Sequence, residues 1–388
     1  MAKYILFYIS VSIVLLLSLY LLSYSNHDND LEDSSTTNDE TLKLWTVEPA
    51  LVEASETFSE TNNKGVTIQT RLFTSHDQLL DELYGAVSLN ETPDLAEIHA
   101  HYGVADFAEQ GLIEPVETYV NANKIDEMFK ALSERFTFND TRYALPIGLD
   151  VPVIYYNASL AEQYGMENFN RLTWDSFWED VDQFHSKVNN DQLWHFHTDM
   201  ETPWYMEAMH NDLSFSPEQS ELNQWSRLVN ELGYMPKLTH QLAIPQFVDG
   251  DGLFLMSSLN QHQLLRRLIA GSFDLGMISL PEVGTSYPAG GAGIIVFTNA
   301  PKEKVTSFFQ YLDEPEMSIK LSLDSYYLPV RADLFTNYQF EQWLRRNDTI
   351  NIQTAINHLE YKNAQLEDEE RWNLLQSLQE SVESEGVD

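Results

Sequence analysis

The chain has 388 residues, of which 60 are Asp or Glu and 22 are Lys or Arg, so its formal net charge at pH 7 is −38. This charge would repel phosphates, which excludes a general role on nucleic acid or on anionic lipid. The chain has no cysteine, which excludes disulfides, thiolate metal sites, cysteine catalysis and lipid attachment at an N-terminal cysteine. Hydrophobic residues make up 43% of the sequence, enough to build a folded core in two or three domain-sized units.

The N-terminal segment, residues 1–25, contains the apolar run Tyr4–Tyr24, which as a helix would span roughly 30 Å of hydrocarbon. Lys3 precedes the run and acidic residues follow it, so the rest of the chain is expected on the extracytoplasmic face of the cell membrane. Two interpretations stay open. The run is a retained membrane anchor, favoured by its length, or a signal peptide cut after Ser25. Residues 26–41 are polar and acidic and are predicted to form a flexible linker.

Strands and helices are predicted to alternate from Leu42 onward. Strands are expected over Leu42–Pro49, Val66–Phe73, Asp94–His99, Val151–Asn157, Leu253–Ser258, Phe273–Pro281 and Gly293–Asn299. Helices are expected over Leu51–Thr61, His76–Val87, Trp174–Ser186 (with Thr173 as N-cap), Asn260–Ala270, Lys302–Leu312 and Pro315–Leu323. This alternation indicates an α/β protein with βαβ units and a mostly parallel sheet.

Two His-x-His pairs could suggest a metal site. His99 with His101, and His195 with His197, would each place two imidazoles on one face of a strand. Polar residues at strand ends that line a cleft or face solvent explain the pairs better, so we expect no metal and no cofactor. The sequence also lacks the short motifs GxxxxGK[ST], GxSxG and HExxH, so no catalytic residue is predicted and enzyme activity ranks last.

Eight segments resemble, in order, the extracellular solute-binding proteins of ABC importers, family 1, which includes maltodextrin- and glycerol-3-phosphate-binding proteins. The segments are LKLWT, TPDLAEIHAHYGVADFAEQGLIEPVETYV, RYALPIGLDVPVIYYNASLAEQYGM, LTWDSFWED, FLMSSLNQHQL, FDLGMISLPEVG, GGAGIIVF and PKEKVTSFFQYLDEPEMSIKLSLDSYYLPVRADLF. The resemblance implies a periplasmic-binding-protein type II fold, in which two α/β lobes hold a ligand in a cleft. By this analogy lobe 1 comprises residues 42–148 and 273–327, and lobe 2 comprises residues 149–272 and 328–388.

The resemblance also implies which residues contact a ligand. The positions that match are Trp45, Glu48, His101, Asp150, Trp204, Asn260, Gly291, Tyr327 and Arg331. Three departures from the family pattern stand out. Ser25 replaces the lipid-bearing cysteine of Gram-positive members, Tyr326 replaces a usual glycine, and Asn260 stands where the family often has tryptophan.

These observations predict the exported substrate-binding component of an ABC importer. It would capture a carbohydrate between its lobes, by shifting them toward a closed state, and deliver it to permease subunits in the membrane as a monomer. Two alternatives remain. A phosphorylated polyol or glycerophosphodiester would need basic residues such as Arg331 and Arg142, and a membrane-anchored sensor would report the ligand to a membrane partner instead.

Overall fold

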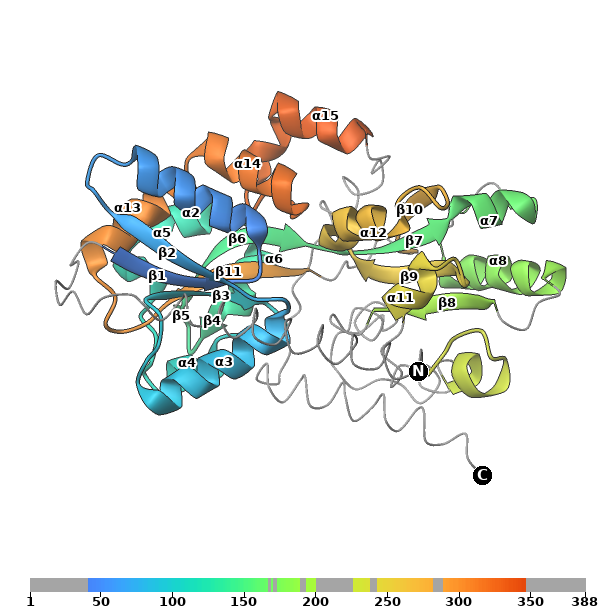
Figure 1. Ribbon diagram of the computed structural model, residues 1–388, viewed down its shortest axis with the longest axis horizontal. Helices are drawn as coiled ribbons and strands as arrows, with labels where there is room; N and C mark the ends of the chain where they lie inside the picture. Colours follow the sequence, from blue (N-terminus) through green and yellow to red (C-terminus); the bar gives the residue numbers. More distant parts are fainter. Residues whose placement is uncertain are drawn as a thin grey trace, which may run out of the picture. The chain divides into compact units, whose positions relative to one another are not determined.

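Two β-sheets with helices on their faces make up the part of the chain that the structure describes (Figure 1). The structure is a computed structural model, and it describes residues 41–166, 169, 173–188, 193–199, 226–237, 243–281 and 289–346. Both sheets are built from apolar strands, and strands in the middle of each sheet are buried along their whole length. The α/β class predicted from the sequence is confirmed. The prediction of a mostly parallel sheet is wrong, because three strand pairings in the two sheets are parallel and four are antiparallel.

The first sheet has the strand order β2-β1-β3-β11-β6. Its strands are β1 (Thr41–Thr46), β2 (Thr67–Leu72), β3 (Leu95–His99), β6 (Ala144–Asp150) and β11 (Gly290–Val296). β1 pairs in parallel with β2 and β3, whereas β11 runs antiparallel to β3 and β6. In β1, Leu42 and Leu44 are buried while Lys43 is exposed, the alternation expected of a strand near the edge of a sheet.

Helices cover both faces of the first sheet, with α2 and α14 on one face and α3 and α4 on the other (Figure 1). Their bounds are α2 Pro49–Thr61, α3 His76–Leu89, α4 Ala105–Glu109, α5 Ala122–Asp126, α6 Lys130–Ser133, α13 Lys302–Leu312 and α14 Pro315–Ser325. A short hairpin of β4 (Thr137–Phe138) and β5 (Thr141–Arg142) lies beside them. Ser75 caps α3 by accepting from the N–H of Gln78, as its residue type favours.

The second sheet has the strand order β10-β7-β9-β8. Its strands are β7 (Pro152–Asn157), β8 (Trp194–Thr198), β9 (Gly252–Ser258) and β10 (Leu275–Ser279), and its helices include α7 (Ala158–Gln163), α8 (Trp174–Lys187), α11 (Ala243–Val248) and α12 (His262–Ile269). β7 is antiparallel to β9 and β10, and β8 is parallel to β9. Thr173 caps α8 in a capping box with Ser176, which confirms the predicted N-cap.

One of the crossings between the sheets is a single residue. β6 ends at Asp150 in the first sheet and β7 begins at Pro152 in the second, with Val151 between them, and the chain returns to the first sheet between β10 and β11. Leu149 exchanges two backbone hydrogen bonds with Leu328, of 2.9 and 2.7 Å, which holds a second segment beside this joint. The predicted start of lobe 2 at residue 149 lies two residues before this joint.

Two predicted segment boundaries need correction. The sequence predicts β10 in lobe 1, which restarts at residue 273, but β10 is hydrogen-bonded along β7 in the second sheet. Residues after Leu328 are predicted in lobe 2, yet Phe335 packs against Phe129 and the N–H of Phe129 donates to the carbonyl of Val330. The segment with α15 (Tyr338–Arg346) also packs on α14, because its apolar side chains belong to the hydrophobic core. The division into lobes otherwise stays a prediction.

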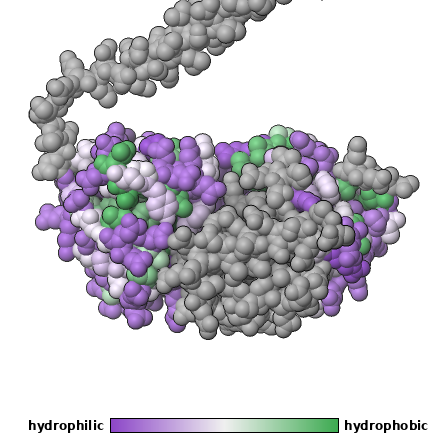
Figure 2. Space-filling view, turned by 90° about the horizontal axis from the view of Figure 1, so that it is seen from below, coloured by the Kyte–Doolittle hydropathy of each residue, from purple (hydrophilic) through white to green (hydrophobic). Residues whose placement is uncertain are grey.

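The predicted membrane segment Tyr4–Tyr24 and most of the linker lie outside the described residues. Within residues 41–346, as far as they are described, no helix is both long enough and apolar enough to cross a bilayer. Figure 2 shows one face of the molecule, where the coloured residues are mostly hydrophilic and the hydrophobic patches are small and separate.

Candidate functional site

Five predicted or neighbouring polar side chains gather where strands of both sheets end. Glu48 follows β1, Glu97 lies in β3, Asp150 ends β6, Asn260 follows β9 and Tyr327 follows α14. The N–H of Asn260 donates to Asp150 at 3.3 Å, and the charges of Glu97, Asp150 and Glu48, together with Asn260, act on the pKa of Tyr327. Burial and these three carboxyl groups raise the pKa of Tyr327 well above its ordinary value. We call these five residues the acidic site.

Glu97 is the residue of this site that the sequence did not single out. Its side chain is fully buried, and its Oε2 accepts hydrogen bonds from the Thr46 hydroxyl and, at 3.0 Å, from the N–H of Val47. Its Oε1 has no hydrogen-bond partner among the described residues. A charged residue inside an otherwise apolar strand was the available signal, since such a residue is rarely buried without a partner.

Asp150 is held at the joint between the sheets. Its Oδ1 accepts hydrogen bonds from the N–H groups of Val151, at 3.0 Å, and Asn260, at 3.3 Å. Its Oδ2, like the Oδ1 of Asn260, has no partner within the described part of the chain. Burial raises the pKa of Asp150 from 3.8 to about 7, against the opposing effect of its hydrogen bonds, which include one with the Ser258 side chain.

Glu48 caps the helix that follows β1. Its Oε1 accepts from the N–H of Ala50 at 2.9 Å, at the N-terminus of α2. Burial and then the charge of Glu97 raise its pKa to about 7, while Arg267 acts in the opposite direction. Two groups of the site are therefore poised between protonated and ionised forms near neutral pH.

Two glycines allow close packing at this edge of the first sheet, one beneath Tyr327 and one against the neighbouring strand. A Cβ atom on Gly148 would lie 2.5 Å from the Tyr327 ring, so only glycine fits beneath the ring. Gly291, a predicted ligand contact, has a φ of +131°, and its Cβ would lie 2.0 Å from the carbonyl oxygen of Gly148. The glycine run that opens β11 thus serves close packing of strands at the edge of the acidic site.

His101 belongs to a buried histidine cluster next to the site. Its N–H donates to Nδ1 of His99 at 3.3 Å, so that nitrogen is an acceptor and the 2.9 Å contact between the two Nδ1 atoms is donated by His101. His76 lies with its ring centroid 4.7 Å from that of His99 and is acted on by the charge of Glu97. Burial lowers the pKa of all three imidazoles, which favours their neutral forms.

The second His-x-His pair lies in β8. His195 stacks on Tyr234 with ring centroids 4.7 Å apart, and its Nε2 lies 3.1 Å from Nδ1 of His185. His197 is fully buried against Gly252. Searched across the described residues, the chain shows no group of three His, Asp or Glu side chains arranged to hold a metal.

The remaining predicted contacts lie elsewhere. Trp45 packs against Phe73 and has the Arg71 guanidinium 4.9 Å above its ring. Arg331 is buried and pairs with Asp313 at 2.7 Å. Trp204 lies outside the described residues. The structure therefore joins Asn260 to Asp150 by a hydrogen bond, sets Tyr327 over Gly148, which also lies against Gly291, and lets the charges of Glu48 and Asp150 act on Tyr327.

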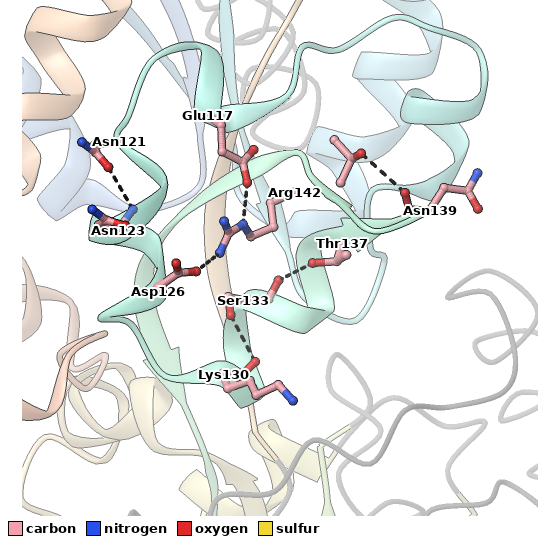
Figure 3. A network of polar contacts seen from close by, with 10 residues as sticks. Glu117, Asn121, Asn123, Asp126, Lys130, Ser133, Thr137, Asn139 and Arg142 are labelled. Atoms are coloured by element: carbon pink, nitrogen blue, oxygen red, sulfur yellow. Dashed lines mark hydrogen bonds and ion pairs between the residues drawn. The ribbon is translucent and has the colours of Figure 1, made fainter.

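Arg142, the other candidate for an anionic ligand, is also engaged. Figure 3 shows its guanidinium between two carboxylates, those of Glu117 and Asp126, and each forms a contact of 2.6 Å with it. An arginine held by two carboxylates has little charge left for a phosphate. Neither basic residue that the sequence proposed for a phosphate is therefore available in the acidic site.

Comparisons with known proteins identify the family of the chain. Residues 53–345 match the family described as bacterial extracellular solute-binding protein. A binding protein of Brucella abortus is 28% identical over 133 residues, which is 34% of this chain and 31% of that protein, so the chain matches less than a third of the length of that curated relative.

Two solved structures share the fold. A solute-binding protein of an ABC transporter from Thermotoga lettingae, bound with α-D-tagatose, has a TM-score of 0.72 at 19% identity, covering 89% of this chain and 93% of that one. The UgpB protein of Mycobacterium tuberculosis, in complex with glycerophosphocholine, has a TM-score of 0.72 at 18% identity and the same coverage of both chains. At these identities the likeness establishes the periplasmic-binding-protein-like fold alone.

Proposed function

This chain belongs to the bacterial extracellular solute-binding proteins, and from that premise we propose that it is the substrate-binding component of an ABC importer for a carbohydrate. A family of this kind works on the extracytoplasmic side of the membrane and binds its solute without a chemical step. The observation that carries the choice of ligand is the set of unpartnered acceptors in the acidic site.

Three oxygen atoms in this site lack a hydrogen-bond donor among the described residues: Oε1 of Glu97, Oδ2 of Asp150 and Oδ1 of Asn260. A buried acceptor without a donor costs about 1–3 kcal/mol, so a ligand that supplies donors is stabilised there. Sugar hydroxyl groups are such donors. The Thermotoga relative, solved with a ketohexose, supports a sugar of similar size.

A phosphorylated polyol or a glycerophosphodiester is the second candidate, supported by the glycerophosphocholine bound to the Mycobacterium relative. It ranks below a carbohydrate because Arg142 and Arg331 both form ion pairs with carboxylates away from the acidic site. A phosphate placed among Glu48, Glu97 and Asp150 would be repelled.

We propose that the chain acts on the extracytoplasmic face of the membrane and that its protein partner is the permease of the importer. Residues 1–25 would serve as anchor or export signal, and residues 26–41 as the tether. A role as a membrane-anchored sensor uses the same ligand site and differs only in the partner. Uptake of the ligand can be measured in cells that carry the permease genes, with and without this chain. Uptake that is lost when the chain is deleted indicates a role in transport rather than in sensing.

A thermal-shift screen tests the proposed ligand class. The full-length chain is purified in a detergent without a sugar headgroup and titrated with neutral sugars, polyols, amino sugars and glycerophosphodiesters. A ligand at 100 times its Kd stabilises the folded state by about 2.7 kcal/mol, a readily measured shift. We expect a sugar to shift the transition. A shift given only by glycerophosphodiesters, or by none of these compounds, would contradict the proposal.

A further inference from the structure

An aromatic contact joins helices of the two sheets beside the crossing at Val151. The ring of Tyr326, at the end of α14, stacks on the imidazole of His262, at the start of α12, with ring centroids 5.4 Å apart. We propose that Tyr326 is a positioning residue, whose ring restricts rotation of the two sheets relative to each other at this crossing. Its effect on ligand capture rests on the proposed function, whereas the restriction itself does not depend on any ligand.

The backbone of Tyr326 is the first observation. Tyr326 follows the last residue of α14 with a φ of 63° and a ψ of 9°, in the left-handed region. Glycine is the usual residue there, because a Cβ atom disfavours this conformation, and glycine is also the residue of the family pattern. A bulky residue persists in such a conformation only where its surroundings hold it. The contacts of the ring therefore account for a tyrosine at this position.

The Tyr326 ring is fixed to the first sheet by the helices that follow β6 and β11. Trp343 of α15 meets the ring edge-on, with centroids 5.3 Å apart. Trp343 in turn stacks on Phe340, which is fully buried, at 5.4 Å. α14, which leads into Tyr326, packs on α2 and on β6 of the first sheet. The ring therefore moves with the first sheet.

The His262 imidazole is fixed to the second sheet. It is buried between the rings of Tyr326 and Tyr155, and its centroid lies 5.9 Å from that of Tyr155 in β7. Tyr155 is itself fully buried, and its hydroxyl lies 2.9 and 3.1 Å from the carbonyl oxygens of Ser258 and Leu259. The imidazole therefore moves with the second sheet.

The stack lies close to the crossing on both of its sides. The N–H of Leu259, just before α12, donates to the carbonyl of Val151 at 3.0 Å. Leu328, two residues after Tyr326, exchanges backbone hydrogen bonds with Leu149, two residues before Val151. A rotation at this crossing therefore shifts the two stacked rings against each other. Stacked aromatic rings attract each other beyond the apolar area that they bury, so their contact opposes that shift.

Distances between spin labels on the full-length chain test this restriction. The sequence has no cysteine, so labels attach only at cysteines that are introduced. Glu60→Cys in α2 with Gln183→Cys in α8 reports the distance between the sheets, and Glu60→Cys with Ser88→Cys in α3 reports a distance within the first sheet. All three positions are exposed, and α8 lies at the end of the second sheet away from the crossing (Figure 1).

Tyr326→Asn is the decisive variant, because asparagine tolerates the left-handed backbone and has no aromatic ring. We expect the distribution of the distance between the sheets to broaden by about 3 Å or more, the displacement that a rotation of about 10° gives over a six-residue strand such as β7. The distance within the first sheet should keep its width. Tyr326→Phe, which keeps the ring, and Tyr338→Asn, at an exposed tyrosine of α15, should leave both distributions unchanged.

An unchanged distance between the sheets in Tyr326→Asn would overturn the proposal. Equal broadening of both distances would also overturn it, because the first sheet itself would then have loosened. Since a change at Tyr326 alters the end of α14 as well, His262→Ala tests the stack from its other side, and it should broaden the same distance without adding to Tyr326→Asn in the double variant. These measurements need no ligand, so their failure would leave the carbohydrate proposal standing.

Discussion

Asp150 combines a structural position with an unusual protonation state. It ends one sheet, accepts two backbone hydrogen bonds and is fully buried, so its charged form lacks the solvation that water would provide. A group with a raised pKa in the folded state contributes stability below its unfolded pKa and loses that contribution as the pH rises through the folded value.

Asp150→Asn should therefore flatten the pH dependence of stability. In the unaltered chain, the contribution of Asp150 falls between about pH 4 and pH 7, from 3.8 in the unfolded state to about 7 in the folded state. We expect this single group to account for about 2–4 kcal/mol across that window. Urea unfolding of both proteins from pH 4 to pH 8 measures the difference. A difference that stays constant with pH would contradict the raised pKa.

Gly291→Ala should destabilise the chain by about 2 kcal/mol or more, because its φ of +131° disfavours a side chain and the new Cβ would meet the Gly148 carbonyl oxygen. Gly85→Ala is the matched control. Gly85 lies in α3, and a methyl group added there would have nothing within 4 Å, so alanine should stabilise by about 0.5–1 kcal/mol. Equal effects of the two substitutions in chemical denaturation would contradict this assignment.

Arg331→Gln should lower stability without changing ligand affinity. Its guanidinium is buried against Asp313, but Lys124 Nζ stays 3.5 Å from the same carboxylate, so we expect a loss of about 2 kcal/mol rather than the roughly 3–5 kcal/mol of an unpaired buried charge. Arg71→Gln, which breaks an exposed pair with Glu82, should cost less than about 1 kcal/mol. A large loss of affinity in folded Arg331→Gln would return Arg331 to the ligand site.

At the scale of helices and strands, short-range sequence patterns predicted the elements and their caps better than they predicted which strands pair. The capping residue Thr173, the helix over α13 and the strand over β7 follow from short-range patterns, and the structure has them nearly as expected. The placement of β10 could not be read from its own residues, because its partner β7 lies more than a hundred residues earlier in the sequence. Strand partners are chosen by packing, which a periodic pattern does not encode.

The residues of the acidic site also divide into those that local sequence patterns predicted and those that depend on distant neighbours. Glu48, Asp150, Asn260 and Tyr327 were predicted because each stands at the end of a predicted element and matches a family motif. Glu97 was not predicted, because its strand reads as apolar and its burial depends on neighbours from β1 and β11. The environment of Arg331 was not predictable either, because its ion pair with Asp313 joins residues that no short motif links.

Thr173→Ala should destabilise the chain by about 1 kcal/mol, since it removes the hydroxyl that accepts from the N–H of Ser176 at the start of α8. Thr57→Ala provides the comparison within a helix. The Thr57 hydroxyl donates only to the Glu53 carbonyl inside α2, so alanine there should be neutral or slightly stabilising. Thermal unfolding of the two variants distinguishes a cap from an ordinary helical position. Equal losses would contradict the capping role.

For the whole molecule, the net charge of −38 predicts a stability that rises with salt. Self-repulsion of a strongly acidic surface opposes compaction, and about 0.5 M salt screens charges beyond a few ångströms. We expect the melting temperature to rise by several degrees between roughly 0.05 and 0.5 M NaCl. KCl should have the same effect if screening is the cause. An unchanged or lower melting temperature would show that surface repulsion contributes little.

The single-residue crossing from β6 to β7 gives the molecule a mechanical lever. β7 extends for six residues beyond Val151, about 20 Å of strand, so a rotation of about 10° at that residue would displace its far end by roughly 3 Å. Asp150, whose carboxylate accepts from the N–H of Val151, stands at the pivot of this lever. A ligand held by Asp150 would therefore contact the residue next to this crossing, where a small backbone rotation accompanies a larger displacement of the far end of β7.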